Sequence, residues 1–133
     1  MGVGQASYDF GVPGEASYGF TQAIKVGSTL YISGQLSQDM EGNFVGEDDF
    51  ELQVRTTLAN LDRVLDHYGA GRDDVVQTTV LVKDFERNDV SRLHSEYFGS
   101  RRPTSTLLGV VALGAGPQQL VEIAAIAVIP ETE

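Results

Sequence analysis

The chain has 133 residues, of which 41% are hydrophobic, enough for one packed domain and too many for a disordered chain. Its net charge of −10, from 19 acidic and 9 basic residues, would repel a nucleic-acid backbone or an anionic membrane surface. With no cysteine there is no disulfide or thiolate metal ligand, and no apolar run has the length of a membrane span. We therefore expect a cytoplasmic protein with neither nucleic acid nor membrane as a partner.

The first nineteen residues are rich in Gly, Ser and Ala and are interrupted by Gly11, Pro13 and Gly14. They predict an irregular N-terminal arm over residues 1–19, which leads into a single domain over residues 20–133.

Two strand patterns open this domain, at residues 20–26 and 29–36. Only a Gly-Ser pair separates them, so they predict a hairpin. A turn at residues 39–43, composed of residue types that favour turns, then leads to a short third strand at residues 44–45.

The spacing of the apolar residues changes to that of a helix over residues 49–68. Asp48 or Asp49 can cap the start of this helix, and Gly69 or Gly71 can end it. The apolar residues recur at alternating steps of four and three, which predicts one buried stripe. These residues are Val54, Leu58, Leu61, Leu65 and Tyr68.

The second half of the chain predicts a strand over residues 75–82, a shorter helix over residues 88–98, and strands over residues 104–113 and 120–129. The element order is β-β-(β)-α-β-α-β-β. This order predicts an α+β domain, a mixed sheet with two helices on one face.

The final strand carries information about assembly. Apart from Glu122, residues 120–129 show no polar alternation, so both faces of this strand should be buried. The helices of a two-layer domain cover only one face of its sheet. We therefore expect neighbouring subunits to cover the other face, in an oligomer whose sheets pack together with the helices outward.

Glu122 is the strongest candidate for a functional residue, because a lone carboxylate in an apolar strand must be hydrogen-bonded, paired or protonated. The alternative is a structural pairing with a cation or backbone donor at a subunit interface. His67 and His94 lie on different predicted helices without a third ligand at suitable spacing, so we expect no metal site. His94 borders the apolar face of its predicted helix, so we expect it to have a packing role.

Several separate motifs lie in the order found in a known family. They are residues 22–27 with 30–35, 58–61 with 74–80 and 84, 97–103, and 121–123 with 125–128. Together they resemble the Rid family, the reactive-intermediate deaminases or YjgF-like proteins, over nearly everything from Phe20 onward. The resemblance implies a chorismate-mutase-like fold and a homotrimer around a central barrel of sheets, with small-molecule ligands in clefts between subunits.

Members of this family hydrolyse reactive enamines and imines released by pyridoxal-phosphate enzymes, without a metal or organic cofactor. The reaction needs a proton donor and acceptor, and a 2-imino acid also needs a group that holds its carboxylate, a task suited to arginine. The resemblance places Glu122 at the family's cleft glutamate, which orients water or shuttles a proton. It places Ser33 and Gly34 among the residues that line the cleft, although a strand glycine often marks only a bulge.

Two positions depart from the RidA type of the family. Phe20 stands at the cleft tyrosine, and Ser105 stands at the carboxylate-binding arginine. Thr106 follows and offers a second hydroxyl, although Ser and Thr in a strand are usually ordinary strand residues. We do not expect Arg102 to replace the missing arginine. It precedes Ser105 by three residues, so on an extended chain it should lie about 10 Å away and point to the opposite face.

We therefore expect an enamine or imine deaminase whose substrates differ from the standard 2-iminobutanoate and 2-iminopropanoate. The alternative is a non-catalytic homotrimer that keeps the ligand cleft; a ribonuclease, also described in the family, ranks third because of the acidic charge. We expect Glu122 to lie in an inter-subunit cleft with Ser33, Gly34 and Ser105, the last on a strand next to the first hairpin.

Overall fold

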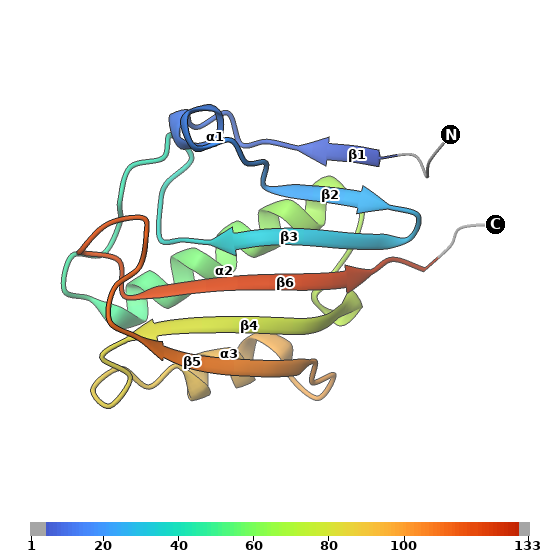
Figure 1. The fold of residues 1–133 in the computed structure, drawn as a ribbon. Helices are drawn as coiled ribbons and strands as arrows, with labels where there is room; N and C mark the ends of the chain where they lie inside the picture. Colours follow the sequence, from blue (N-terminus) through green and yellow to red (C-terminus); the bar gives the residue numbers. More distant parts are fainter. Residues whose placement is uncertain (1–4, 131–133) are drawn as a thin grey trace.

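The computed structural model describes residues 5–130, which form one six-stranded sheet and three α-helices (Figure 1). The strands are β1 (Gln5–Tyr8), β2 (Ala23–Val26), β3 (Thr29–Gln35), β4 (Val75–Lys83), β5 (Thr104–Val110) and β6 (Val121–Val128). The helices are α1 (Pro13–Tyr18), α2 (Phe50–His67) and α3 (Ser91–Phe98), and a 3-10 turn, η1, spans Arg72–Asp74. Within the described chain, no helix has the length and apolar character needed to cross a membrane.

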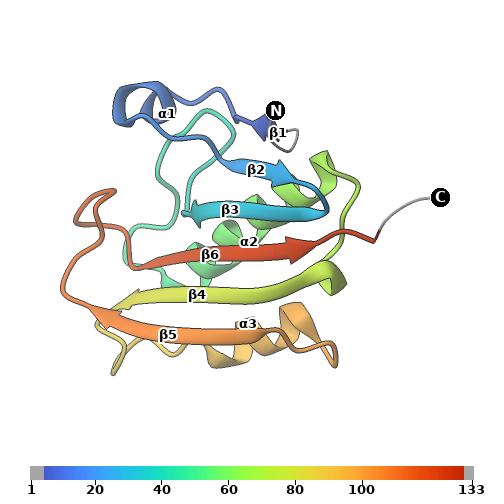
Figure 2. The same cartoon turned by 45° about the vertical axis from the view of Figure 1, so that its right-hand side comes forward.

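The sheet is mixed and has the strand order β1-β2-β3-β6-β4-β5. All neighbouring strands are antiparallel except β4 and β5, which run parallel. Parallel strands need a long crossover connection, and α3 lies in the segment that joins these two. Helices α2 and α3 both lie behind the sheet (Figures 1 and 2), so the predicted α+β fold with two helices on one face is confirmed.

The predicted hairpin forms between β2 and β3, with Val26 opposite Thr29. Gly27 has a φ of +61°, the left-handed conformation that tight hairpin turns require and that glycine adopts without strain. Strand β2 begins at Ala23 rather than at residue 20, because the amides of Phe20 and Gln22 are bonded to the carbonyls of Glu15 and Tyr8 instead of to β3.

The long helix matches its prediction closely. Asp49 caps α2, its side chain accepting a hydrogen bond from the backbone amide of Leu52 at 3.0 Å. Val54, Leu58 and Leu61 are buried against the sheet, as is Leu65. The helical spacing of these side chains is what places α2 across the sheet and closes the core on that face.

The N-terminal arm is not irregular in the part that the structure describes. Strand β1 adds an edge to the sheet beside β2, and α1 follows it. The Glu15 carboxylate stabilises the turn between them by accepting from the backbone amides of Phe10, Gly11 and Val12 at 2.7, 2.9 and 3.1 Å. The small residues of this segment indicated a loop, but a single buried carboxylate satisfies the backbone groups that a loop would leave to water.

Three other predicted boundaries also change. The short third strand is only an isolated bridge between Gln38 and Phe44, and α3 begins at Ser91 rather than at residue 88. Strand β5 ends at Val110, three residues earlier than predicted. The last two errors lie at the ends of elements, where local sequence patterns are least informative.

Strand β6 has two different faces in the single chain. Val121, Ile123, Ala125 and Ala127 are buried under the helices, whereas the residues between them are half-buried or exposed. The described chain thus covers one face of the sheet and leaves the other open. Burial of that open face by neighbouring subunits stays a prediction.

Candidate functional site

The candidate site centres on a bulge in β3. Ile32 pairs with Ala125 of β6, but the next pair is Gln35 with Ile123, so three steps along β3 match two steps along β6. The extra residue bends β3 and interrupts the ladder at positions 33 and 34, the feature known as a β-bulge.

Hydrogen bonds from Ser33 to the segment before β2, and one from Gln35 of β3, hold the bulge in place. The Ser33 amide donates to the carbonyl of Gln22 at 2.8 Å, and the Ser33 hydroxyl donates to the carbonyl of Thr21 at 2.6 Å. The Gln35 side chain donates from Nε2 to the Ser33 carbonyl at 3.0 Å. Ser33 therefore has a structural role, and its hydroxyl is already engaged with the backbone.

Gly34 provides the space in which the Glu122 carboxyl lies. A Cβ atom built on Gly34 would lie 2.6 Å from Cδ and 3.0 Å from Oε2 of Glu122, closer than real Cβ contacts allow. Any side chain at position 34 would thus displace the carboxyl. The bulge that a strand glycine suggests is present, and its consequence is a seat for Glu122.

The Glu122 carboxyl is half-buried on the open face of the sheet, and burial raises its pKa above the usual glutamate value. Among residues 5–130 no hydrogen bond to this carboxyl is present. A carboxyl whose pKa lies closer to neutrality can both accept a proton from water and return one to a leaving group. The chemistry available here is therefore general acid and base catalysis.

Ser105 lies on the other face of the sheet. It is aligned with Thr78 of β4 and accepts a hydrogen bond from the Thr78 hydroxyl at 2.8 Å. The same hydroxyl is 2.9 Å from Nε2 of His94 on α3, so both contacts lie on the helix-covered face. The expectation that the strand of Ser105 is next to the first hairpin is wrong within one chain, because β6 and β4 lie between.

Of the other candidate residues, Thr106 lies in strand β5 and Phe20 lies before β2. Thr106 is aligned through Thr79 with Ala124, which places it on the same open face as Glu122. Phe20 is 36% exposed and packs edge-to-face against Tyr18. One chain thus brings Glu122 and Gly34 into contact, keeps Thr106 on their face, and separates them from Ser105.

His94 was expected to pack, and it does contact the Phe98 ring at 4.7 Å between centroids. Its hydrogen bond with Thr78 was not expected, because the sequence does not reveal which strand residue faces a helix residue sixteen positions away. Burial lowers the pKa of His94, so the neutral imidazole is favoured.

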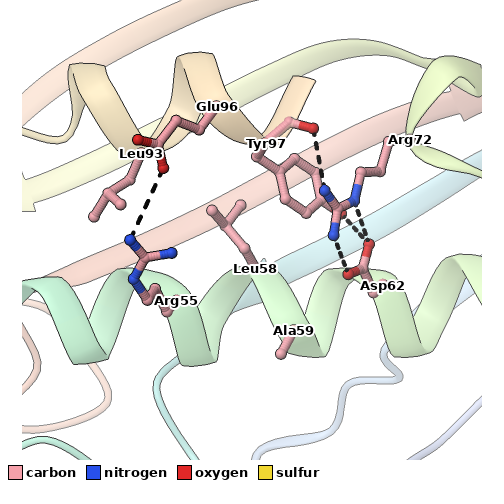
Figure 3. Close-up of a pocket in the computed structure, with 8 residues that line it drawn as sticks. All are labelled: Arg55, Leu58, Ala59, Asp62, Arg72, Leu93, Glu96 and Tyr97. Atoms are coloured by element: carbon pink, nitrogen blue, oxygen red, sulfur yellow. Dashed lines mark hydrogen bonds and ion pairs between the residues drawn. The ribbon is translucent and has the colours of Figure 1, made fainter. Parts of the chain in front are cut away.

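A groove of about 370 Å³ lies between α2 and α3, on the far side of the helices from the sheet (Figure 3). Its lining is Arg55, Leu58, Ala59, Asp62, Arg72, Leu93, Glu96 and Tyr97. Arg72 donates to both carboxylate oxygens of Asp62 at 3.1 and 2.9 Å, and the Tyr97 hydroxyl donates to Asp62 at 2.6 Å. Because these charges satisfy one another, we interpret the cluster as a clamp that joins α2, η1 and α3. Glu122 does not line this groove.

No three His, Cys, Asp or Glu side chains within residues 5–130 gather as a metal ligand set would. The sequence reasoning missed the role of Glu15, which lies in the segment expected to be irregular. The one available signal was its position near the start of a short helix whose first residue is proline, a pattern typical of an ordered helix N-terminus.

Comparison with known proteins adds sequence relatives over most of the chain. The family model of endoribonuclease L-PSP matches residues 13–129. A RutC family protein of Sulfurisphaera tokodaii is 35% identical over 108 residues, which cover 80% of this chain and 85% of the relative. The human 2-iminobutanoate/2-iminopropanoate deaminase is 32% identical over 110 residues, covering 82% of this chain and 79% of the relative.

Solved structures share the fold along nearly the whole chain. Rv2704 of Mycobacterium tuberculosis, described as a member of the YjgF/YER057c/UK114 family, superposes with a TM-score of 0.83 at 29% identity. YyfA of Yersinia pestis, described as a Rid family protein, has a TM-score of 0.83 at 30% identity. Each superposition covers 95% of this chain and 100% of the other.

Replacing Glu122 with glutamine is expected to stabilise the fold at neutral pH. Below the pKa of the unfolded carboxyl, folded and unfolded chains both hold the proton, so burial of the charge costs nothing. As the pH rises through the raised folded-state pKa, the wild type must charge a half-buried carboxyl and loses stability that the variant keeps. Urea unfolding from about pH 4 to 8, at one fixed protein concentration, measures this difference.

Glu41→Gln is the matched control, because Glu41 lies exposed on a turn. The difference between wild type and Glu122→Gln should widen with pH, whereas the control should follow the wild type. A difference that is constant with pH, or that narrows as the pH rises, would contradict the assigned environment of Glu122.

Proposed function

Because the chain belongs to the Rid (YjgF-like, endoribonuclease L-PSP) family, whose members include 2-iminobutanoate/2-iminopropanoate deaminases, we propose that it hydrolyses a reactive enamine or imine. Water adds to the carbon of the C=N bond, the nitrogen takes a proton, and the resulting carbinolamine collapses to a carbonyl compound and ammonia. The observation that carries this proposal is the half-buried Glu122 carboxyl seated against Gly34.

In this mechanism Glu122 moves the protons. As a carboxylate it accepts a proton from the attacking water, and as a carboxylic acid it returns that proton to the departing nitrogen. Its raised pKa supports both roles, since burial favours the acid form more than in an ordinary glutamate. The reaction needs no redox step, and the atoms balance as imine plus water giving carbonyl plus ammonia.

We further propose that the active form is a homotrimer with ligand clefts between subunits. The open face of the sheet supports this proposal, because it presents Tyr31, Ala124, Ile126 and Val128, a largely apolar surface beside Glu122. A second chain packed there would cover these side chains and exclude water around the carboxyl. The proposed substrate contacts in the assembled cleft are Phe20, Ser33, Gly34, Ser105 and Thr106. Ser33 would act as an acceptor while its hydroxyl donates to Thr21, and Ser105, exposed on the edge strand β5, would come from a neighbouring subunit.

The substrate we propose is not a standard 2-imino acid, because Ser105 stands where the family resemblance places the carboxylate-binding arginine. A charge-assisted hydrogen bond is typically worth about 1.5–3 kcal/mol, or roughly one to two decades in rate. Ser105 offers only a neutral hydroxyl, and that hydroxyl already contacts Thr78.

The endoribonuclease in the name of the matching family model is a less favoured function. The net charge of −10 would oppose binding of a phosphate backbone unless the few cations formed a patch. Most arginines with described contacts are engaged with acidic side chains on the helices, as in the pairs of Arg55, Arg72 and Arg92.

The central test is ammonia release from enzymatically generated imines, with and without a 2-carboxylate, corrected for spontaneous hydrolysis. Wild type and Glu41→Gln should accelerate at least one imine, and Glu122→Gln should lower that acceleration by about two orders of magnitude or more, the usual worth of general acid-base catalysis. If wild type accelerates none, the non-catalytic ligand-binding alternative replaces this proposal. If Glu122→Gln retains full activity, Glu122 is not the catalytic group.

Restoring a cation at position 105 tests the substrate class. Ser105→Arg should raise the rate on 2-iminobutanoate about ten-fold or more, since it supplies a charge-assisted hydrogen bond to the carboxylate. Ala59→Arg is the matched control, because it adds the same charge at an exposed position on the outer side of α2, away from the open face of the sheet. Equal gains in both variants would indicate general electrostatic attraction and refute a specific carboxylate site. A wild type that hydrolyses 2-iminobutanoate as fast as an arginine-bearing relative would also contradict the proposal, because the missing arginine would then have no effect on substrate choice.

The assembly is tested by light scattering at micromolar concentration. Wild type should have about three times the chain mass of 14.3 kDa. Tyr31→Glu, which places a charge on the open face, should dissociate the trimer, whereas Met40→Glu on the turn after β3 should not. A wild type that stays a folded monomer would contradict the proposal.

A further inference from the structure

Three buried polar side chains connect α1 to the bulge beneath Glu122. Glu15, Gln22 and Gln35 are only 5%, 2% and 1% exposed. Gln22 donates from Nε2 to Oε2 of Glu15 at 2.8 Å, and Gln35 donates from Nε2 to Oε1 of Gln22 at 3.0 Å. The same Nε2 of Gln35 also donates to the Ser33 carbonyl at 3.0 Å, inside the bulge.

Glu15 is the first member of this series of hydrogen bonds, and its carboxyl is an anion. Burial by itself raises the pKa of Glu15, but hydrogen bonds from Gln22 and from the backbone amides of Phe10, Gly11 and Val12 outweigh burial and hold the pKa below the usual glutamate value. All four groups donate to the carboxylate, so the charge is stabilised by N–H groups alone.

An anion at this position dictates how both glutamines are oriented. A carboxylate can only accept hydrogen bonds, so Gln22 must turn its NH₂ group towards Glu15 and its oxygen towards Gln35. Gln35 must then turn its NH₂ group towards Gln22, which also points it at the Ser33 carbonyl. A neutral amide in place of Glu15 could donate as well as accept, and this ordering would be lost.

The orientation of Gln35 satisfies one end of its side-chain amide and leaves the other end without a partner. Its Nε2 makes two hydrogen bonds, whereas its buried Oε1 has no partner among the described residues. Leaving a buried acceptor unpaired is unfavourable. The opposite orientation would bring Oε1 against two acceptor oxygens, so the Ser33 carbonyl and the Gln22 Oε1 that Glu15 orients fix Gln35 together.

We propose that Glu15 is a positioning residue for the Glu122 carboxyl: its negative charge orients Gln22 and Gln35, which hold the Ser33–Gly34 bulge in the shape that seats Glu122. The bulge touches Glu122 directly at Gly34. Glu15 thus acts through the two glutamines without touching the reacting groups. The catalytic consequence rests on the function proposed above, but the positioning itself does not.

The test replaces Glu15 with glutamine and follows two signals in the substrate-free, full-length protein by NMR. The backbone amide of Ser33 donates to the backbone carbonyl of Gln22. The ratio of its hydrogen-exchange rate to that of the buried Val80 amide in β4 should rise about ten-fold or more. The pKa of Glu122 should fall towards the ordinary glutamate value by about 0.5 or more, because a loosened bulge admits water to the carboxyl.

Asp62→Asn is the matched control. It makes the same carboxylate-to-amide change at a residue that also accepts several hydrogen bonds, but in the clamp between the helices. It should destabilise the protein without changing the ratio of Ser33 to Val80 exchange or the pKa of Glu122. If it shifts both signals as Glu15→Gln does, the effect is general destabilisation and the proposal fails.

Gln22→Met keeps the test decisive should Glu15→Gln fail to fold. This variant leaves Glu15 with its three backbone donors, so the N-terminal turn keeps its anchor, but it cuts the connection to Gln35. It should reproduce both NMR changes. A Gln22→Met protein with wild-type Ser33 exchange and an unchanged Glu122 pKa would overturn the proposal.

Neither signal requires turnover, so the positioning role can fail or succeed independently of the deaminase proposal. Where ammonia release is measurable, Gln22→Met should lower kcat at least three-fold with little change in KM, because a displaced acid-base group affects the chemical step. A loss confined to KM would instead place the effect on substrate binding and contradict the role proposed for Glu15.

Discussion

Two helices cannot cover both faces of a six-stranded sheet, and the open face that results determines most of what is distinctive about this protein. On the covered face, α2 and α3 bury the alternate side chains of β3, β4 and β6. On the open face, the same strands present apolar residues together with one carboxyl, that of Glu122. A surface of this kind is stable in water only at a cost, which an assembly of chains would remove.

The two important glutamates show how the same side chain acquires opposite properties. Glu15 is almost fully buried, yet four N–H donors keep its pKa low and its charge fixed. Glu122 is only half-buried, but no donor from the described chain reaches it, so burial raises its pKa. Hydrogen bonding thus favours the charged form of Glu15, whereas burial without hydrogen bonds favours the neutral form of Glu122.

The bulge connects these two glutamates: Glu15 is linked to it through Gln22 and Gln35, and Glu122 lies against it at Gly34. It exists because β3 has an extra residue relative to β6, and Gly34 is required there because Glu122 occupies the space of a side chain. A regular strand would have placed a side chain where the carboxyl now lies. The local irregularity that weakens the ladder is therefore the feature that creates the candidate site, as is common for bulges near functional sites.

Features that depend on local periodicity and on single unusual residues could be predicted from the amino-acid sequence. The helical spacing from Val54 to Leu65 predicted α2, the Gly-Ser pair predicted the hairpin, and Glu122 was recognisable as the lone charge in an apolar strand. The family resemblance, which rests on motif order, predicted the fold.

Features that depend on pairing between distant segments became visible only in the folded protein. The strand order places Ser105 across the sheet from Glu122 and beside Thr78, and the buried Glu15 turns an apparently irregular arm into β1 and α1. Neither could be read from the chain, because the register of non-adjacent strands and the partners of a buried carboxylate are set by contacts between residues far apart in sequence.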